Sequence, residues 1–290
     1  MNPGKGVSNR EGVASQVSTT SGGFGSLVRR IQSKDILWSE RYLGNTPFHQ
    51  TFWVNTRLRK AVAANAHLAH GMLLDVGCGL KPYQKFFEPF IEKYVGSEYL
   101  PESGYRGNTA DLCGDAASLP IGDESIDTIL CTEVMVNLAD PETTIAEFAR
   151  VLRTGGTLIT TAPFVYPLHD TNDFFRFSKD GLAAIMKRHG LAIQKVVPLS
   201  GTAVTLAVMF NLYWYDVGFM WTKWLYPIGL VLRPLLWLLC FAVNVLGGLF
   251  ELLLPDERLS FNHLTVARKG SLETTHALEE MNGSREGTGI

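Results

Sequence analysis

The stretch that decides the fold reads Leu73-Leu74-Asp75-Val76-Gly77-Cys78-Gly79, an apolar strand that ends in an acid and a pair of glycines. In a doubly wound sheet, ligands bind beyond the carboxyl ends of the strands. Glycine at 77 and 79 lets the backbone approach a ligand more closely than any Cβ would allow. Dinucleotide-binding turns carry Gly or Ala where this chain has Pro82, so the turn disfavours a pyrophosphate ligand.

Apolar runs and helical patterns alternate from residue 72 onward. We predict strands over 72–76, 94–98, 126–131, 157–162, 191–197 and 264–267, and helices over 82–91, 141–152 and 178–189. Strands separated by helices at this spacing predict an α/β fold, with an open and mostly parallel sheet covered by helices on both faces.

Composition divides the chain into six segments. A polar tail over 1–26 precedes a helical cap over 27–70 and the core over 71–200. An apolar helical insertion over 201–258 separates the core from its last strand over 259–269, and a second polar tail covers 270–290. We expect both tails to be disordered, because they cannot bury enough apolar surface to offset the entropy of ordering.

Charge and cysteine usage narrow the class of protein. The net charge of the 290 residues is −2, so no basic excess indicates a nucleic-acid partner. The four cysteines form no CxxC pair, which excludes a zinc ribbon and a disulfide scaffold and fits a reducing compartment. No metal site is expected, and the first thirty residues contain no apolar run typical of a secretory signal, so we expect a cytoplasmic chain.

Further features follow the glycine turn in order. The predicted strand over 94–98 ends at Glu98, about twenty residues on, where a carboxylate can accept both hydroxyls of a ribose. Asp115 and Ala116 come next, followed by a strand that runs on to Glu133. A helix and a turn at Gly155–Gly156 complete the set.

This ordered set resembles the class I S-adenosylmethionine-dependent methyltransferases, in particular the bacterial methyltransferase type 11 group, over residues 72–197. The resemblance implies a Rossmann-like seven-stranded sheet with an antiparallel last strand, and S-adenosyl-L-methionine as the cofactor. The residues that it implies at the cofactor are Asp75, Gly77, Cys78 and Gly79 at the amino-acid end, Glu98 at the ribose, Asp115 and Ala116 at the adenine edge, and Glu133 at the methionine side.

The sequence departs from the pattern of that family at two places. Lys81 replaces the third glycine of the turn, a glycine that allows close packing between helix and strand. Val136 and Asn137 replace a common Glu-His pair after the fourth strand, which removes one usual candidate base.

A polar and aromatic segment over 163–178 follows the fifth strand and is predicted to cross the ligand edge of the sheet. It also resembles a stretch of the same bacterial group. We predict His169 as a base or substrate-binding residue and Asp170 or Asp173 as the residue that orients it. Arg176 would anchor either a substrate anion or the loop itself. The alternative is a structural hydrogen-bond cluster that holds the crossover in place.

The insertion over 201–258 is more apolar than a surface segment needs to be. It contains four of the six tryptophans (Trp214, Trp221, Trp224 and Trp237), a composition typical of a membrane interface. If the strands on either side belong to one sheet, the insertion cannot cross a bilayer once. A two-pass hairpin, a re-entrant loop and helices in the interfacial plane remain, and we favour the last. A cap over an apolar acceptor pocket and a homodimer face are the alternatives.

These observations predict methyl transfer to a hydroxyl of a lipid-linked, glycan or other amphiphilic acceptor at a membrane surface. The chain would then be peripheral or monotopic on the inner membrane face. Two other functions stay open: a catalytically silent methyltransferase-like scaffold or assembly partner at the membrane, and a nicotinamide-dependent oxidoreductase, which Pro82 disfavours.

Overall fold

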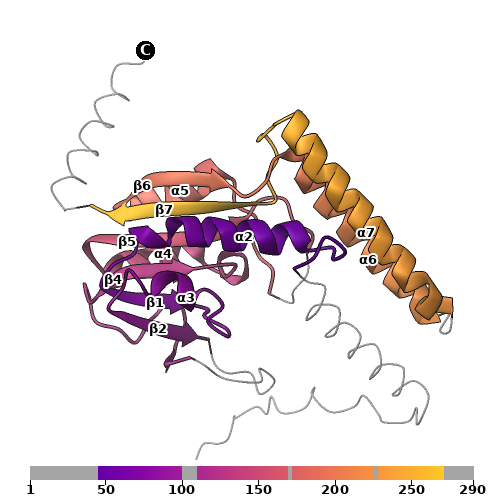
Figure 1. The fold of residues 1–290 in the computed structure, drawn as a ribbon. Coiled ribbons are helices and arrows are strands. Elements are labelled where there is room, and N and C mark those ends of the chain that lie inside the picture. The colour runs from indigo at the N-terminus through magenta and orange to yellow at the C-terminus, as the bar shows by residue number, and fades with distance from the viewer. Residues whose placement is uncertain (1–44, 100–109, 169–171, 225–227, 271–290) are drawn as a thin grey trace, which may run out of the picture. The chain divides into compact units, whose positions relative to one another are not determined.

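The computed structural model describes residues 45–99, 110–168, 172–224 and 228–270, with side chains described outside 219–231 (Figure 1). The predicted tail over 1–26, the first part of the predicted cap and residues 271–290 lie outside the described residues. All of the described residues fall in one compact unit, Gly44–Ile290.

A seven-stranded sheet forms the centre of the fold, with the strand order β3-β2-β1-β4-β5-β7-β6. Strands β1 to β5 pair in parallel, and β7 is antiparallel to both β5 and β6. The predicted Rossmann-like methyltransferase sheet with an antiparallel last strand is therefore confirmed. The strands are β1 (Met72–Val76), β2 (Lys93–Glu98), β3 (Leu112–Cys113), β4 (Ile126–Cys131), β5 (Leu152–Pro163), β6 (Leu191–Pro198) and β7 (Asn262–Lys269).

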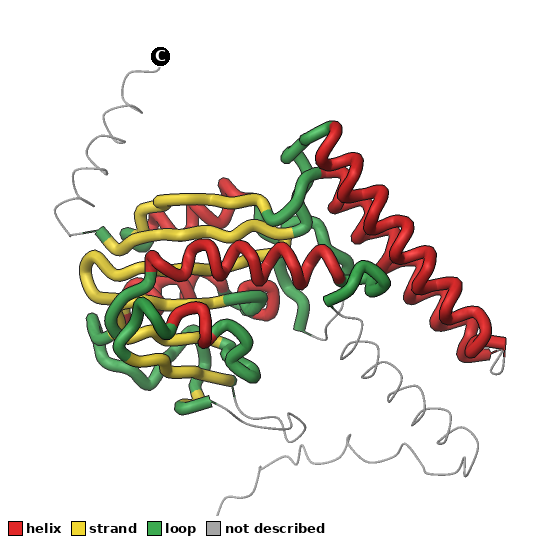
Figure 2. The backbone as a smooth tube through the Cα atoms, viewed as in Figure 1, coloured by secondary structure: helices red, strands yellow, loops and turns green. Residues whose placement is uncertain are grey.

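Helices cover both faces of the sheet (Figure 2). One face packs against α4 (Pro141–Val151) and α5 (Lys179–Arg188) through the buried side chains Phe148 and Met186. The other face packs against α2 (Phe52–Asn65), η1 (Ala66–Leu68) and the start of α6 (Thr202–Trp224), which bury Val62 and Val204. A strand that is buried on both faces reads as a nearly continuous apolar run, as in Met72–Leu74 of β1 and Ile129–Cys131 of β4.

Local sequence explains where the helices begin. The Asp140 side chain accepts a hydrogen bond from the Thr143 N–H and caps α4, whose first residue is Pro141. The Ser178 hydroxyl oxygen accepts from the Gly181 N–H and caps α5 in the same way.

The helix predicted over 82–91 is wrong in extent, since α3 covers only Gln84–Phe87. Pro89 follows directly after Glu88 and has no N–H to donate to the Lys85 carbonyl, so the helical hydrogen bonds end there. At the other end, Lys81 has a left-handed backbone with a φ of 53°, which does not belong to a right-handed helix. The two-residue strand β3 was not among the predicted strands.

The insertion forms a hairpin of two antiparallel helices, α6 and α7 (Ile228–Leu253), placed between β6 and β7 (Figure 1). Hydrogen bonds join its two ends at the sheet, in a region here called the hairpin root. The Thr202 N–H donates to the Asp256 carbonyl at 2.7 Å, and the Gly201 N–H donates to Glu251 Oε2 at 2.9 Å. The chain thus leaves and re-enters the sheet at one place, as the topology requires.

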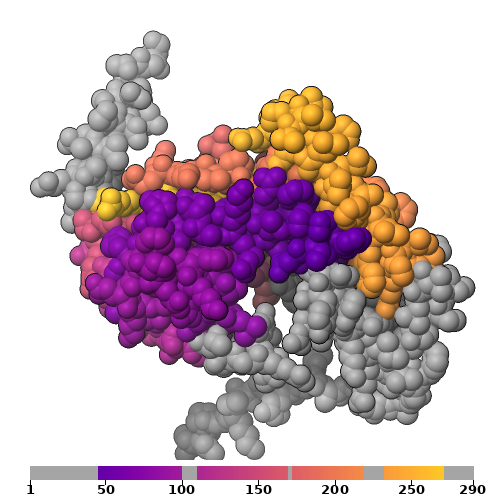
Figure 3. Space-filling model, in the orientation of Figure 1, coloured from indigo at the N-terminus to yellow at the C-terminus, as the bar shows by residue number. Residues whose placement is uncertain are grey.

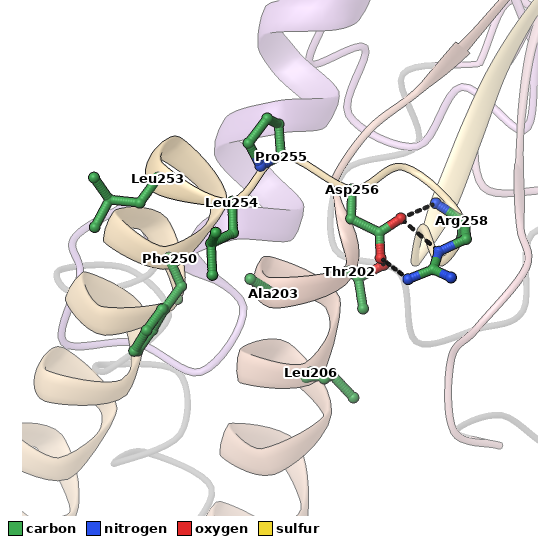
Figure 4. Close-up of a pocket in the computed structure, with 10 residues that line it drawn as sticks. Thr202, Ala203, Leu206, Phe250, Leu253, Leu254, Pro255, Asp256 and Arg258 are labelled. Carbon is green, nitrogen blue, oxygen red and sulfur yellow. Dashed lines mark hydrogen bonds and ion pairs between the residues drawn. The ribbon is translucent and has the colours of Figure 1, made fainter.

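Near this root, an open groove of about 720 Å³ lies between the first turns of α6 and the last turns of α7 (Figure 4). Leu206, Phe250 and Leu254 supply apolar walls, and the ion pair of Asp256 with Arg258 lies at one end.

Helix α7 presents different faces to the protein and to its surroundings. Figure 3 shows the indigo surface of α2 against the orange surface of α7. Toward α2, the Asn244 carbonyl accepts a hydrogen bond from Trp53 Nε1 at 3.0 Å, and Glu251 pairs with Arg57 at 2.8 Å. On the opposite side lies a row of exposed apolar residues at helical spacing, here called the α7 outer stripe: Leu235, Leu238, Leu239, Val245, Leu246, Leu249, Leu252 and Leu253. Within the described residues, Leu232–Leu253 is long and apolar enough to cross a membrane, judged by length and composition.

Candidate active site

The predicted glycine turn lies directly after β1, at the carboxyl edge of the sheet. Gly77 and Gly79 both adopt left-handed backbones, with φ of 71° and 50°. A Cβ on Gly77 would lie 2.3 Å from Cγ2 of Val134, whereas a Cβ on Gly79 would meet no atom within 4 Å. Position 77 therefore needs glycine both because a Cβ would collide with Val134 and because of its left-handed backbone. Position 79 needs glycine only for its left-handed backbone, and it lies beside open space.

The backbone N–H groups of this turn are already used within the protein. The Gly77 and Cys78 N–H groups donate to the Ser97 carbonyl of β2 at 2.9 and 3.1 Å. The Gly79 N–H donates to Glu98 Oε1 at 2.5 Å. A phosphate would find these donors occupied and a carboxylate beside them, so the turn is unsuited to a dinucleotide.

Asp75 is buried at the end of β1, with 1% of its surface exposed. Its Oδ2 accepts a hydrogen bond from the Tyr94 hydroxyl at 2.6 Å, while Oδ1 has no partner among the described residues. Burial is the main cause that raises the pKa of Asp75 to about 7, with a further contribution from the charge of Glu98. The acid is thus poised to be either neutral or charged near neutral pH.

Lys81 takes the left-handed conformation that a third glycine of the turn would favour. Its side chain crosses β2 over Gly96, where a Cβ would lie 2.5 Å from the Lys81 Cε. The Lys81 ammonium then pairs with Asp111 at 2.6 Å, and Asp111 also accepts from the Gly96 N–H at 2.7 Å. The replacement of glycine by lysine is therefore accommodated by a side chain that lies along the sheet.

Asp115 and Ala116 form a turn just after β3. The Asp115 Oδ1 accepts from the Ala117 N–H at 2.9 Å, and its carbonyl accepts from the Ser118 N–H at 2.9 Å. Ala116 is buried. Because β1, β2 and β3 run in parallel, this turn lies on the same edge of the sheet as Gly79 and Glu98.

Glu133 follows β4 and also has a left-handed backbone, with a φ of 59°. Its N–H donates to the Thr161 hydroxyl at 3.0 Å, and that hydroxyl donates to Glu133 Oε1 at 2.7 Å. Asn262 Nδ2 donates to the same carboxylate oxygen at 2.5 Å. A non-glycine residue with this φ is strained, and these hydrogen bonds hold it in place.

The crossover segment after β5 is fixed by Arg176. Its Nε donates to the Tyr166 carbonyl at 3.0 Å and its Nη2 to the Pro167 carbonyl at 3.1 Å. The two Nη atoms also pair with the buried Asp173 carboxylate, and Nη1 donates to the Phe175 carbonyl at 2.9 Å. All five N–H donors of the guanidinium are therefore used inside the loop.

The other residues predicted on this segment are placed differently. His169 and Asp170 lie outside the described residues, so their predicted roles as base and orienter stay predictions. At the Val136–Asn137 replacement, the Val136 carbonyl accepts from the Phe174 and Phe175 N–H groups at 2.9 and 3.4 Å. This contact attaches the crossover to the end of β4.

Sequence reasoning missed several residues that complete the site: Tyr94, Asp111, Thr161 and Asn262. Tyr94 and Thr161 lie inside predicted strands, but nothing in a strand pattern says which partner a hydroxyl will reach. Asn262 lies just before the predicted last strand and contacts a residue 129 positions away. Among the described residues, no group of His, Cys, Asp and Glu is arranged to hold a metal ion.

The edge fits a cationic cofactor. Carboxylates gather there at or just after the ends of four neighbouring strands: Asp75, Glu98, Asp115 and Glu133. The one lysine among them, Lys81, is paired with Asp111. The glycine cradle, here the turn at Gly77 and Gly79, has open space beside Gly79, where a Cβ would meet no atom within 4 Å, and the unpartnered Asp75 Oδ1 offers an acceptor for a bound group.

Comparisons with known proteins agree with this geometry. The family model described as a methyltransferase domain matches residues 74–160. The chain is similar to two ubiquinone/menaquinone biosynthesis C-methyltransferases called UbiE. It is 28% identical over 111 residues to the protein from Teredinibacter turnerae and 31% identical over 111 residues to that from Shewanella halifaxensis. It is also similar to the crystal structure of the cyclase SpnF, at 19% identity and a TM-score of 0.48, over 74% of this chain and 80% of that one.

Residues 74–160 therefore match a methyltransferase domain, as the motif order predicts. S-adenosylmethionine is the cofactor of this class of domain. The match to each UbiE protein covers 38% of this chain and 39% of the relative, and the α6–α7 hairpin lies outside the 74–160 range of the family model.

Proposed function

We propose that the chain transfers a methyl group from S-adenosylmethionine to a hydroxyl of a lipid-linked, glycan or other amphiphilic acceptor at a membrane surface. The observation that carries this proposal is where the hairpin is attached. β6 ends and β7 begins at the carboxyl edge of the sheet, the edge that also carries Gly77 and Glu133. An apolar hairpin rooted there would bring the transfer site to the bilayer.

The one-sided character of α7 supports helices in the interfacial plane. The outer stripe is apolar along its whole length, whereas the opposite face is occupied by Asn244 and Glu251 in contact with α2. In a helix that crosses a bilayer, polar and charged side chains such as Asn244 and Glu251 are costly. A helix that lies in the interface needs only one apolar face.

The groove at the hairpin root supports an acceptor with an aliphatic part. Its walls are Leu206, Phe250 and Leu254, and it lies a few residues from the ends of β6 and β7. The UbiE relatives are named for methyl transfer to carbon in ubiquinone and menaquinone biosynthesis. Carbon is therefore the other atom that the acceptor could offer.

When bound, the cofactor supplies a methyl group already activated on a sulfonium. The chain then has to hold an acceptor hydroxyl in line with that methyl group and accept its proton. His169 is the proposed base, with Asp170 or Asp173 as the residue that orients it. Arg176 is proposed as the anchor of the loop, because its donors are already used there.

The experiment combines binding and transfer with the full chain. Calorimetry measures the affinity for S-adenosylmethionine, and the protein is then incubated with the ¹³C-methyl cofactor and a bacterial lipid extract. We expect binding and a labelled lipid, whose ¹³C chemical shift separates oxygen-bound from carbon-bound methyl. Gly79→Val, which would fill the open space beside Gly79, is the matched control.

Each failure points to a different alternative. A chain that binds no cofactor would be a silent membrane scaffold. A chain that binds cofactor but remains monomeric and wholly soluble in the presence of vesicles would not use the hairpin as a membrane contact. A soluble dimer would assign the outer stripe to a homodimer face.

A further inference from the structure

Asn262 is the first residue of β7, directly after the hairpin, and its side chain reaches into the candidate site. It is 2% exposed, and its Nδ2 lies 2.5 Å from Glu133 Oε1. Thr161 on the neighbouring strand β5 donates to the same oxygen at 2.7 Å. One oxygen of the Glu133 carboxylate therefore receives two hydrogen bonds from two strands.

The orientation of the Asn262 amide follows from chemistry. An ionised carboxylate only accepts hydrogen bonds, so the NH₂ group must face Glu133 and the carbonyl must face away. Asn262 Oδ1 is buried and has no partner among the described residues. A buried amide oxygen without a partner is costly, and its retention here favours a role at the site over simple packing.

The hairpin root fixes the backbone of Asn262. The Ser260 hydroxyl donates to the Asn262 carbonyl at 2.6 Å and lies 3.4 Å from the Ser200 hydroxyl. The Ser200 hydroxyl in turn lies 2.8 Å from that of Thr205 in the first turn of α6. All three hydroxyl residues are buried. Hydrogen bonds thus run without interruption from the hairpin to Asn262.

We propose that Asn262 is a positioning residue: its amide keeps the Glu133 carboxylate ionised and aimed toward the cationic end of the bound cofactor. This inference rests on the proposed function. It also gives the hairpin a second role, which is to position a residue of the site: the hydrogen bonds at the hairpin root fix the backbone of Asn262.

Other titratable groups near Glu133 do not substitute for the amide. Among the described residues these groups are the Tyr83 and Tyr166 phenols and the Cys131 thiol. Burial first, and then the charge of Glu133, raises the pKa of both Tyr83 and Tyr166 to about 12. Burial is also the main cause that raises the pKa of Cys131 to about 12. All three groups are neutral at physiological pH, so their titration leaves the charge of Glu133 unchanged there.

The test is Asn262→Asp, which keeps the shape of the side chain and replaces the donor by a second carboxylate. Two carboxylates at hydrogen-bond distance share a proton, and a cationic ligand favours its release. Because the pKa of Asp75 is about 7, the wild-type affinity for S-adenosylmethionine itself changes with pH between about pH 6 and about pH 8, and the wild type is the baseline. Over that range the affinity of Asn262→Asp should rise about tenfold more than that of the wild type, with additional proton release seen by calorimetry in buffers of different ionisation enthalpy.

Two further variants make the result specific. The double variant Asn262→Asp with Glu133→Gln restores an amide–carboxylate pair in the reverse sense and should return the proton release to the wild-type level. Asn65→Asp is the matched control, since Asn65 is equally buried but lies at the end of α2 beside Lys195, away from the site. Thermal unfolding checks that each variant folds. If Asn262→Asp is unfolded, Asn262→Ala replaces it, with an expected loss of about tenfold in affinity and no new pH dependence.

The outcomes separate this inference from the proposed function. A wild-type chain that binds no cofactor overturns the proposed function and the inference with it. A wild-type chain that binds, with Asn262→Asp or Asn262→Ala matching its affinity at every pH, overturns the inference alone. Proton release by Asn65→Asp equal to that of Asn262→Asp would also overturn it.

Discussion

The sheet and the hairpin are both apolar, but they use apolar residues in opposite ways. Leu73 and Leu74 of β1 have no exposed surface, whereas Leu249 and Leu252 of α7 are 48% and 79% exposed. In the sheet, side chains from both faces cover the strands and leave only the carboxyl edge for chemistry. In the hairpin, one face is anchored by polar contacts and the other is uncovered. Both regions are apolar in sequence, so hydropathy does not distinguish them. The exposed fractions of their side chains do.

This comparison assigns a different task to each region. The sheet edge gathers carboxylates around a glycine cradle, an arrangement suited to a small polar ligand. The hairpin offers a large apolar surface without any charged partner on its outer stripe, an arrangement suited to a bilayer or another apolar surface. Variants that affect one region and spare the other test whether the tasks are separate.

The largest effect is expected from Gly77→Ala. The new Cβ would lie 2.3 Å from Val134 Cγ2 on a backbone with a φ of 71°, so both the contact and the conformation are unfavourable. We expect a loss of about 3–4 kcal/mol in the free energy of unfolding and an affinity for S-adenosylmethionine about 100-fold lower. Chemical denaturation and calorimetry measure the two effects.

Gly79→Ala is the matched control for the cradle. It has a similar backbone, with a φ of 50°, but open space around the new Cβ, so its cost should be about 1 kcal/mol. Equal losses for the two variants would show that backbone conformation, and not the space next to Val134, limits this turn.

Asn244→Ala should have the next largest effect and should act on the hairpin. The Asn244 side chain pairs with Asn211 of α6 at 3.0 Å and donates to the carbonyls of Pro47 and His49 at 2.8 and 3.0 Å. Its removal leaves buried polar groups without partners, for a loss of about 2–3 kcal/mol in the free energy of unfolding. Cofactor affinity should stay at the wild-type level, and a drop in that affinity would contradict the separation of tasks.

The double variant Leu246→Glu with Leu249→Glu places two negative charges on the outer stripe. It should leave the fold intact and weaken membrane binding. Both side chains are about half exposed, at 50% and 48%, so little packing is lost. We expect partition onto phosphatidylcholine–phosphatidylglycerol vesicles to fall about 30-fold, measured by co-flotation. Phe90→Glu, at an exposed apolar residue outside the hairpin, is the control and should partition as the wild type does. A similar loss for the control would mean that charge alone, and not the stripe, decides partition.

Per pH unit, the smallest effect concerns Asp75. Because burial raises the pKa of Asp75 to about 7, the folded chain binds this proton more tightly than the unfolded chain does. The free energy of unfolding should therefore fall as the pH rises from about 4 to about 7, by at most about 1.4 kcal/mol per pH unit from this group. Asp75→Asn retains an acceptor for Tyr94 and should lack that part of the slope. Parallel pH profiles for the two proteins would refute a raised pKa.

Local patterns sufficed for the sheet and for most of the predicted site. The order of acids and glycines after β1, β2 and β4 was readable because each lies within a few residues of an apolar strand. The α3 helix was overestimated because Pro89 was not weighed against the apolar pattern around it. The two-residue β3 is too short for any periodicity to indicate.

What could not be predicted are contacts between distant residues. Glu133 meets Thr161 and Asn262 only because β4, β5 and β7 are adjacent in the sheet, and adjacency of β5 with β7 is a property of topology. The direction of the outer stripe depends on which face of α7 meets Trp53 and Arg57, which its own sequence does not specify.

The carboxylates at the edge of the sheet have a consequence for turnover. The methyl donor is a sulfonium cation, and the thioether that remains after transfer has lost that charge. Glu98 and Glu133, together with Asp75 when it is ionised, therefore favour the reactant over the spent product through simple Coulomb attraction. We expect rapid product release and weak product inhibition, with a preference for the charged form that fades as salt is added.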